Sequence, residues 1–136
     1  MPGGRRKARI AAMQALYEAD CTGHDSRLSL ARLVGERAAC PAHLVYAWEL
    51  LEGVLAHRET IDGTIVRFAP AWPLEQMAPV DRNILRLALF EILIDRKVPL
   101  KAVINEAVEL AKAFGSAGSA KFINGVLGSV SAPAIK

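Results

Sequence analysis

The sequence lacks the long apolar run that a membrane-spanning helix requires. Such a helix needs about 18 consecutive apolar residues, and the longest apolar stretch, near residues 84–94, is interrupted by Arg86 and Glu91. The cations near the N-terminus are followed by Gln14 and Glu18 rather than by an apolar segment with a cleavage site, which argues against a signal peptide. We therefore expect a cytoplasmic protein with no membrane contact.

Motifs of common catalytic sites are also missing. The chain contains no Gly-x-Ser-x-Gly elbow and no His-Glu-x-x-His pair. Its nearest approach to a Walker-type phosphate loop, residues 115–121, lacks the second Gly directly before Lys121. The three histidines have no spaced carboxylate or nucleophile as a partner. We therefore expect neither an enzyme nor a bound cofactor.

Cysteine is scarce, and each of the two cysteines is followed by a histidine three residues later. These two pairs, Cys21/His24 and Cys40/His43, have a spacing compatible with a tetrahedral zinc site. Both pairs flank segments with strong helical patterns, which can fold without a metal. We therefore treat both cysteines as free thiols and expect no metal site.

Strand patterns are absent, whereas helical patterns recur along the chain. With 136 residues, 52% hydrophobic and 23% charged, the chain is not disordered and can bury its own core. We expect an all-α fold of about seven helices, in a single domain over residues 1–136 with residues 1–4 and 131–136 loose. The expected helices cover 8–17, 28–38, 41–55, a segment capped by Thr60 and ending at 68, then 79–96, 99–114 and a last helix from about 120.

Glycines and capping residues mark several of the expected helix ends. Gly23 is expected to end the first helix, and Asp25 or Ser26 to cap the second. Gly115 is expected to end the helix before it as a left-handed cap. Gly125 lies inside the last helix, where it costs about 1 kcal/mol relative to Ala, so we expect it to permit close packing.

The helix expected over residues 79–96 is apolar nearly all round, which predicts a central position in the core. Asp81, Arg82 and Arg86 are exceptions to this pattern. A partly buried arginine needs a paired partner. These charges therefore indicate either an internal ion pair, which is favoured, or a ridge that faces a partner protein.

Positive charge is concentrated at the N-terminus. Arg5, Arg6, Lys7 and Arg9 place four cations within five residues. The chain has 17 basic and 14 acidic residues, so without this cluster 13 basic residues face 14 acidic ones. Because neighbouring charges act within one screening length, the cluster should attract polyanions. The alternative is a solvated, frayed terminus.

A second cationic position lies where the last helix is expected to start. A helix N-terminus after small residues, with Lys121 in its first turn, can hold a phosphate through backbone N–H groups. Phe114 and Phe122 lie nearby in the sequence, and exposed aromatic rings beside cations are typical of single-stranded RNA binding. Their helical positions favour ordinary core packing instead. The residues alone indicate a helical domain with RNA binding as one interpretation.

Four blocks of the sequence resemble the NusB family. Each block has low specificity alone, but the set follows the family's order and spacing and covers nearly the whole chain. The blocks are Arg6-Lys7-Ala8-Arg9 leading to Ala12-Met13-Gln14-Ala15-Leu16-Tyr17, then residues 80–91, 103–112 and 121–127.

This resemblance implies two packed helical halves and a role in transcription antitermination. It implies binding of boxA-type single-stranded RNA in ribosomal RNA transcripts, together with ribosomal protein NusE and the transcription elongation complex. Four phosphate contacts from the N-terminal cluster would give a log–log salt slope of about −3. The implied RNA contacts are Arg5, Arg6, Lys7, Arg9, Phe114, Lys121 and Phe122, and the implied partner contacts are Tyr17, Glu75, Asp81, Arg82 and Arg86.

One departure from the family pattern lies in the turn before the last helix. Relatives often carry acidic residues there, whereas residues 116–119 have none. We hypothesise that the loss of this repulsion makes RNA binding less dependent on the partner protein.

Two other interpretations of the whole chain compete with RNA-binding antitermination. A similar helical module begins RNA cytosine methyltransferases, whose catalytic domain we do not expect here because the chain ends at Lys136. A scaffold that binds only protein is the second, with the basic end serving solubility. Whether the protein forms a homodimer is left open.

Overall fold

The computed structural model describes residues 2–36 and 41–135. Over these ranges the fold is entirely helical and contains no strand, which confirms the all-α prediction. The helices are α1 (Pro2–Thr22), α2 (Ser26–Glu36), α3 (Pro41–Ala56), α4 (Arg58–Phe68), the 3-10 helix η1 (Leu74–Gln76), α5 (Pro79–Leu89), the π-helix η2 (Phe90–Asp95), α6 (Leu100–Phe114) and α7 (Ser119–Ile135).

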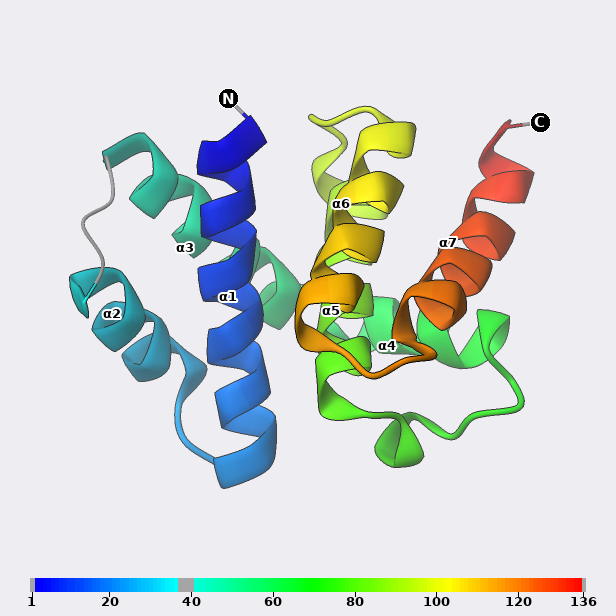
Figure 1. Cartoon of the computed structure of the whole chain (residues 1–136), viewed down its shortest axis with the longest axis horizontal. Helices are drawn as coiled ribbons and strands as arrows, with labels where there is room; N and C mark the ends of the chain where they lie inside the picture. Colours follow the sequence, from blue (N-terminus) through cyan, green and yellow to red (C-terminus); the bar gives the residue numbers. More distant parts are fainter. Residues whose placement is uncertain (1, 37–40, 136) are drawn as a thin grey trace.

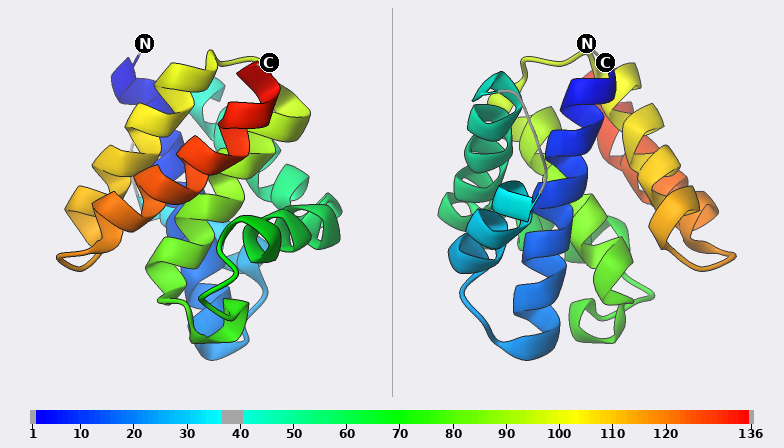
Figure 2. Two further views of the ribbon diagram at one scale, coloured as in Figure 1. Left: turned by 90° about the vertical axis from the view of Figure 1, so that its right-hand side faces the viewer. Right: turned by 60° about the vertical axis from the view of Figure 1, so that its left-hand side comes forward.

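The helices form two groups that lie side by side (Figure 1). Helices α1, α2 and α3 make up the first group, and α4 to α7 make up the second. Helix α5 joins the groups because it packs against α1 and α3 of the first and against α4, α6 and α7 of the second. Figure 2 shows α6 and α7 packed against each other and both chain termini at the same end of the molecule.

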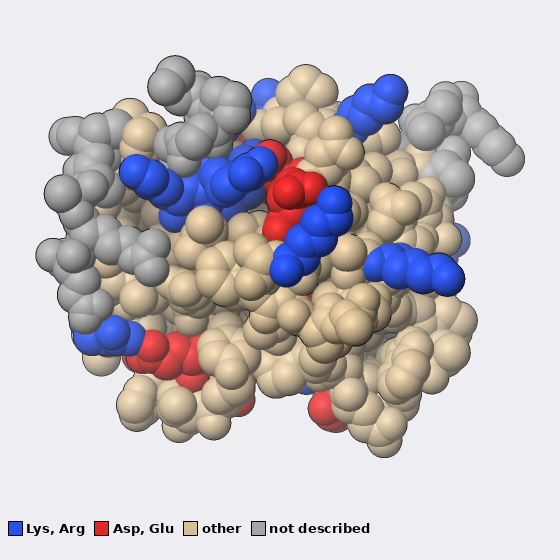
Figure 3. Space-filling model, viewed as in Figure 1, with Lys and Arg blue, Asp and Glu red and all other residues tan. Residues whose placement is uncertain are grey.

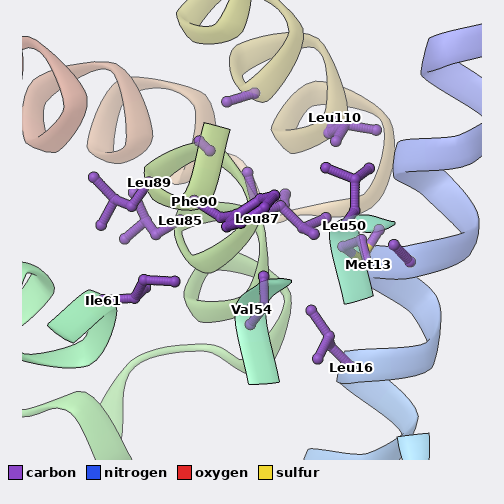
Figure 4. Close-up of a cluster of buried hydrophobic side chains, with 14 of the residues drawn as sticks. Met13, Leu16, Leu50, Val54, Ile61, Leu85, Leu87, Leu89, Phe90 and Leu110 are labelled. Atoms are coloured by element: carbon purple, nitrogen blue, oxygen red, sulfur yellow. The ribbon is translucent and has the colours of Figure 1, made fainter. Parts of the chain in front are cut away.

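The core is built around α5, as its apolar sequence predicts. All residues from 83 to 89 are buried. Figure 4 shows Leu85 and Leu87 among buried side chains of the surrounding helices, including Leu50 and Leu110. Burial of one such side chain stabilises the fold by about 1.5–3 kcal/mol, so α5 supplies a large share of the hydrophobic free energy.

The continuous helix expected over residues 79–96 is divided into α5 and η2. The π-helix ends at Arg96, which has a left-handed backbone with φ 58° and donates its N–H to Glu91 O at 2.9 Å. A π-helical turn changes the direction of the side chains it carries, and such turns are frequent at functional sites. Here the turn contains Glu91, whose side chain is buried.

The connection between α1 and α2 follows the sequence prediction. Gly23 has φ 77° and donates its N–H to Ala19 O at 2.8 Å, which ends α1. Glycine takes this left-handed conformation without a Cβ clash. Asp25 Oδ1 accepts the N–H of Arg27 at 2.9 Å, which makes Asp25 the cap of α2.

Three local predictions are wrong. Gly115 is extended (φ −92°, ψ −172°) rather than left-handed, and its lack of a side chain matters because a Cβ there would lie 2.5 Å from Ser119 Cβ. A Cβ at Gly125 would meet no atom within 4 Å, so this glycine does not permit close packing. Thr60 does not cap α4, which begins directly after His57.

The segments near the chain ends have a helical backbone. Helix α1 begins at Pro2 and helix α7 continues to Ile135. Ser131 is buried, and its hydroxyl donates to Leu127 O at 2.7 Å. The expectation that these ends are loose stays a prediction.

Gly53 is a position where one added methyl group should destabilise the fold. A Cβ there would lie 2.2 Å from two ring atoms of Phe90, which is buried. We expect Gly53→Ala to lower the free energy of unfolding by about 1–3 kcal/mol, because overpacking forces the ring to move. Gly63→Ala is the matched control, since its Cβ would meet no atom within 4 Å. Urea unfolding measures both, and equal stability of the two variants would contradict the prediction.

Candidate nucleic-acid interface

The basic cluster lies on the first turns of α1. Arg5, Arg6 and Lys7 are exposed, whereas Arg9 is only 4% exposed. Figure 3 shows basic side chains gathered over the N-terminal part of α1 and further basic side chains over α6 and the start of α7, with acidic side chains between the two groups. The cluster is thus part of a regular helix and faces the same side as the beginning of α7.

Arg9 is buried because it forms an ion pair with Glu91 inside the protein. Its Nε and Nη2 donate to Glu91 Oε2 and Oε1, both at 2.9 Å. The hydroxyl of Tyr46 in α3 also donates to Glu91 Oε1. A carboxylate that is 1% exposed thus has three donors, as a buried charge requires. The interaction connects α1, α3 and η2.

Burial and hydrogen bonding shift the pKa values of both partners of Glu91. Burial, and then the hydrogen bond to Glu91, raise the pKa of Tyr46 well above that of a free tyrosine. Burial acts to lower the pKa of Arg9, but the hydrogen bonds and charge of Glu91 outweigh it and raise that pKa. Both groups therefore keep their protons at neutral pH. The assignment of Arg9 as an RNA contact stays a prediction, which its burial and its pairing with Glu91 do not favour.

Arg6 is exposed but already has a carboxylate partner. Its Nε and Nη2 donate to Glu106 Oε1 and Oε2 at 3.0 and 2.7 Å. Glu106 belongs to α6, and its Oε1 also lies 3.7 Å from Arg9 Nη1. The hydrogen bond from Arg6 is the main cause that lowers the pKa of Glu106, so this carboxylate is charged at neutral pH. Acidic groups thus offset part of the positive charge of the cluster.

Arg5 and Lys7 remain available for an external anion. Neither has an ion-pair partner in the part of the chain that the structure describes. The guanidinium carbon of Arg5 lies 5.4 Å from the ring centroid of Tyr46, which is a cation–π distance. Tyr46 therefore contacts both Arg5 and Glu91. No sequence signal points to this role, because Tyr46 follows the helical pattern of α3.

The start of α7 forms a second part of the basic face. Lys121 is exposed and Phe122 is half-buried, and both line a pocket of about 510 Å³ beside the turn between α6 and α7. Trp72, which is 55% exposed, lines the same pocket. Phe114 is 38% exposed but does not line it. An aromatic surface beside a lysine can stack bases of a single strand, and the sequence analysis missed Trp72.

Asp81, Arg82 and Arg86 do not form a ridge that faces a partner. Arg86 is 3% exposed and donates to Asp62 through Nε at 2.8 Å and to Asp20 through Nη1 at 2.9 Å. Arg82 Nε donates to the same Asp20 at 3.0 Å. Asp81 is also buried, at 8% exposed. Internal pairing is therefore confirmed for both arginines, whereas a role of these three residues as partner contacts stays a prediction, which the burial of Asp81 and Arg86 does not favour.

Asp20 is the centre of this second buried network. Its Oδ2 accepts from Arg82, Arg86 and also Asn83 Nδ2, the last at 2.8 Å. Burial acts to raise the pKa of Asp20, but the hydrogen bond from Asn83 and the charge of Arg86 outweigh it and lower that pKa. The network joins the C-terminal end of α1 to α5 and, through Asp62, to α4.

Tyr17 and Glu75 remain accessible, unlike the other three residues assigned to a partner. Tyr17 is 39% exposed and Glu75 is exposed in η1. Figures 1 and 2 place the C-terminal part of α1 and η1 at the end of the molecule opposite the chain termini. The candidate partner surface therefore lies at the end away from the basic cluster.

Metal-binding and membrane-spanning features are absent from the residues that the structure describes. No group of three or more His, Cys, Asp or Glu side chains there could hold a metal ion. Cys21 is free and exposed, and Cys40 lies outside the described residues. No helix within the described ranges is long and apolar enough to cross a membrane.

The sequence matches the model of the NusB family over residues 6–132. The chain belongs to the NusB family. The transcription antitermination protein NusB of Dehalococcoides mccartyi strain CBDB1 is 50% identical over 131 residues, which cover 96% of this chain and 92% of that protein. The NusB protein of Chloroflexus aggregans is 48% identical over 93% of this chain and 85% of its own length.

Solved NusB structures share the fold. NusB of T. maritima superposes with a TM-score of 0.86 at 32% identity and covers 93% of this chain and 89% of its own. A chain from a crystal structure of the antitermination factors NusB and NusE in complex with dsRNA gives a TM-score of 0.87 at 27% identity, over 96% of this chain and 97% of its own. As a member of this family, the protein is a transcription antitermination factor and not an enzyme.

The pair of Arg9 and Glu91 should be essential for stability. We expect Glu91→Gln to lower the free energy of unfolding by about 3–5 kcal/mol, because a buried arginine loses its charge partner. Glu109→Gln is the matched control, since Glu109 is exposed on α6. Chemical denaturation measures both variants. A loss below about 1 kcal/mol in Glu91→Gln would show that the fold does not depend on this pair.

Proposed function

We propose that this protein binds boxA-type single-stranded RNA of ribosomal RNA transcripts together with ribosomal protein NusE, within the transcription elongation complex. The observation that carries the proposal is that two groups of basic side chains, one at the start of α1 and one over α6 and the start of α7, lie on the same side of the molecule with acidic side chains between them (Figure 3). Family membership supports it, as does the likeness to a chain solved with NusE and dsRNA.

Phosphate groups are captured first, by cations that have no acidic partner among the residues described by the structure. Arg5 and Lys7 at one end of the face and Lys121 at the other supply three such contacts. Each contact to a single strand contributes about −0.7 to the log–log salt slope. The expected slope is therefore about −2 rather than the −3 that four contacts of the N-terminal cluster would give.

Sequence choice requires contacts other than these phosphates, because phosphate contacts do not distinguish bases. Phe122 and Trp72 line one pocket with Lys121, so bases of a strand held by Lys121 can stack there. Phe114, half-exposed near the end of α6, offers a further ring. NusE supplies the remaining base contacts in this proposal, from a position at or near Tyr17 and Glu75.

Two alternatives to RNA binding by a monomer have different consequences. A protein-only scaffold would leave the exposed cations without a role, whereas Tyr17 and Glu75 would be sufficient for a partner surface. A homodimer that covers the basic face would compete with RNA. Sedimentation with and without RNA therefore distinguishes a homodimer from the RNA-bound monomer.

The salt dependence of RNA binding tests the proposed function. We expect fluorescence anisotropy with labelled boxA-type RNA to show binding that NusE enhances, with a slope of about −2. The double variant Arg5→Ala/Lys7→Ala should reduce the slope to about −0.7, since one of three contacts remains. Arg9 is left intact because its loss would disturb the core.

The matched control is the double variant Arg27→Ala/Arg67→Ala. It removes the same charge from exposed positions on α2 and α4, outside the face formed by α1, α6 and α7, and it should keep the wild-type slope. NusE binding without any RNA binding would identify a protein scaffold instead. An equal loss of slope in both double variants would show that net charge, rather than this face, governs binding.

A substitution at Gly118 tests the hypothesis that RNA binding is favoured by the absence of acidic residues from the turn between α6 and α7. Gly118 is exposed, and a Cβ there would meet no atom within 4 Å, so Gly118→Asp should fold normally. We expect it to weaken RNA binding about threefold at low salt through repulsion of phosphate near Lys121. Gly118→Asn is the uncharged control. The hypothesis fails if the two variants bind RNA equally well in anisotropy titrations.

A further inference from the structure

A groove of about 390 Å³ lies between the beginnings of α1 and α6. We refer to it as the α1–α6 groove. The carboxylate of Glu106, which lines it, also holds the guanidinium of Arg6. The lining residues are Arg5, Arg9, Val98, Pro99, Ala102, Asn105 and Glu106.

Arg6 faces solvent, but one of the two edges with which its guanidinium can bind a phosphate, the edge formed by Nε and Nη2, is occupied. The planar guanidinium binds carboxylate and phosphate in the same way, through two parallel N–H groups. In Arg6 these groups are Nε and Nη2, and Glu106 accepts from them at 3.0 and 2.7 Å. The Arg6 side chain is 45% exposed and that of Glu106 is 17% exposed. The carboxylate therefore lies where a phosphate would lie.

We propose that Glu106 competes with RNA for Arg6. In the free protein, the Glu106 carboxylate occupies one edge of the Arg6 guanidinium. When RNA enters the α1–α6 groove, a phosphodiester group takes that edge instead. The inference rests on the proposed function. RNA binding at this point exchanges one anion for another on Arg6. Glu106 keeps an attractive partner after the exchange, because Arg9 Nη1 lies 3.7 Å from its Oε1.

The exchange has a consequence for affinity. A half-exposed ion pair is weak enough to be displaced, but its loss reduces the gain from the new phosphate contact. Phosphate contacts carry no sequence information, so this reduction applies equally to every RNA. Glu106 therefore keeps the intrinsic affinity of the basic end low and leaves base contacts and the partner protein to determine which RNA is bound.

The variant Glu106→Gln tests this competition, because it keeps the shape of the side chain and removes its charge. We expect Kd to fall about fivefold at low salt for boxA-type RNA and for a scrambled RNA of equal length. The salt slope should become steeper by about 0.7, because the phosphate contact of Arg6 is then no longer offset by the release of a carboxylate. Glu109→Gln makes the same charge change at an exposed position of α6 and should change Kd less than twofold.

A double-mutant cycle decides whether the effect acts through Arg6. The gain from Glu106→Gln should disappear when it is measured in an Arg6→Ala background. Unchanged or weaker RNA binding by Glu106→Gln would overturn the proposal. So would a gain that persists without Arg6, or an equal gain in Glu109→Gln, since each would reflect general electrostatics.

Two control measurements distinguish a folding defect from a change in RNA binding. Thermal unfolding checks each variant, and if Glu106→Gln loses cooperative unfolding, Glu106→Asp shortens the side chain at constant charge and should still tighten RNA binding. A wild-type protein that binds no RNA would refute the proposed function itself. Wild-type binding without a gain in a folded Glu106 variant would refute only the competition.

Discussion

The buried ion pair between Arg9 and Glu91 is the constraint on which the rest of the structure depends. Two charges removed from water are tolerated only when their hydrogen-bonding groups are satisfied, and Glu91 meets this condition with two donors from Arg9 and one from Tyr46. The π-helix η2 carries Glu91 to this position. Because the pair joins α1, α3 and η2, it also fixes the turn of α1 that presents Arg5 and Lys7.

A second buried network, around Asp20, holds the other end of α1 against α5. Between the two networks, Met13 and Leu16 of α1 are buried in the core. Helix α1 is therefore held against the second helical group by buried ion pairs near both of its ends and by apolar contacts between them. This arrangement separates two accessible surfaces, with free cations at one end of α1 and Tyr17 toward the other.

The electrostatics of the basic end differ from what its composition implies. Four cations lie close together in the sequence, but Arg9 is neutralised inside the core and Arg6 is held by Glu106 at the surface. The positive face instead extends along the molecule, with Lys121 at the start of α7. A face with fewer, more widely spaced cations binds polyanions less strongly and with a weaker salt dependence than a compact cluster.

The sequence by itself determined the all-α fold, the central position of α5, the turn at Gly23 and Asp25, and the family. These features depend on periodicity and capping, which act over a few residues. It also predicted that Arg82 and Arg86 pair internally, since buried arginines require partners. Only the tertiary structure decided which cations of the N-terminal cluster face solvent. The partner of Arg9 lies 82 residues away and that of Arg6 lies 100 residues away, and no local pattern encodes contacts at such separations.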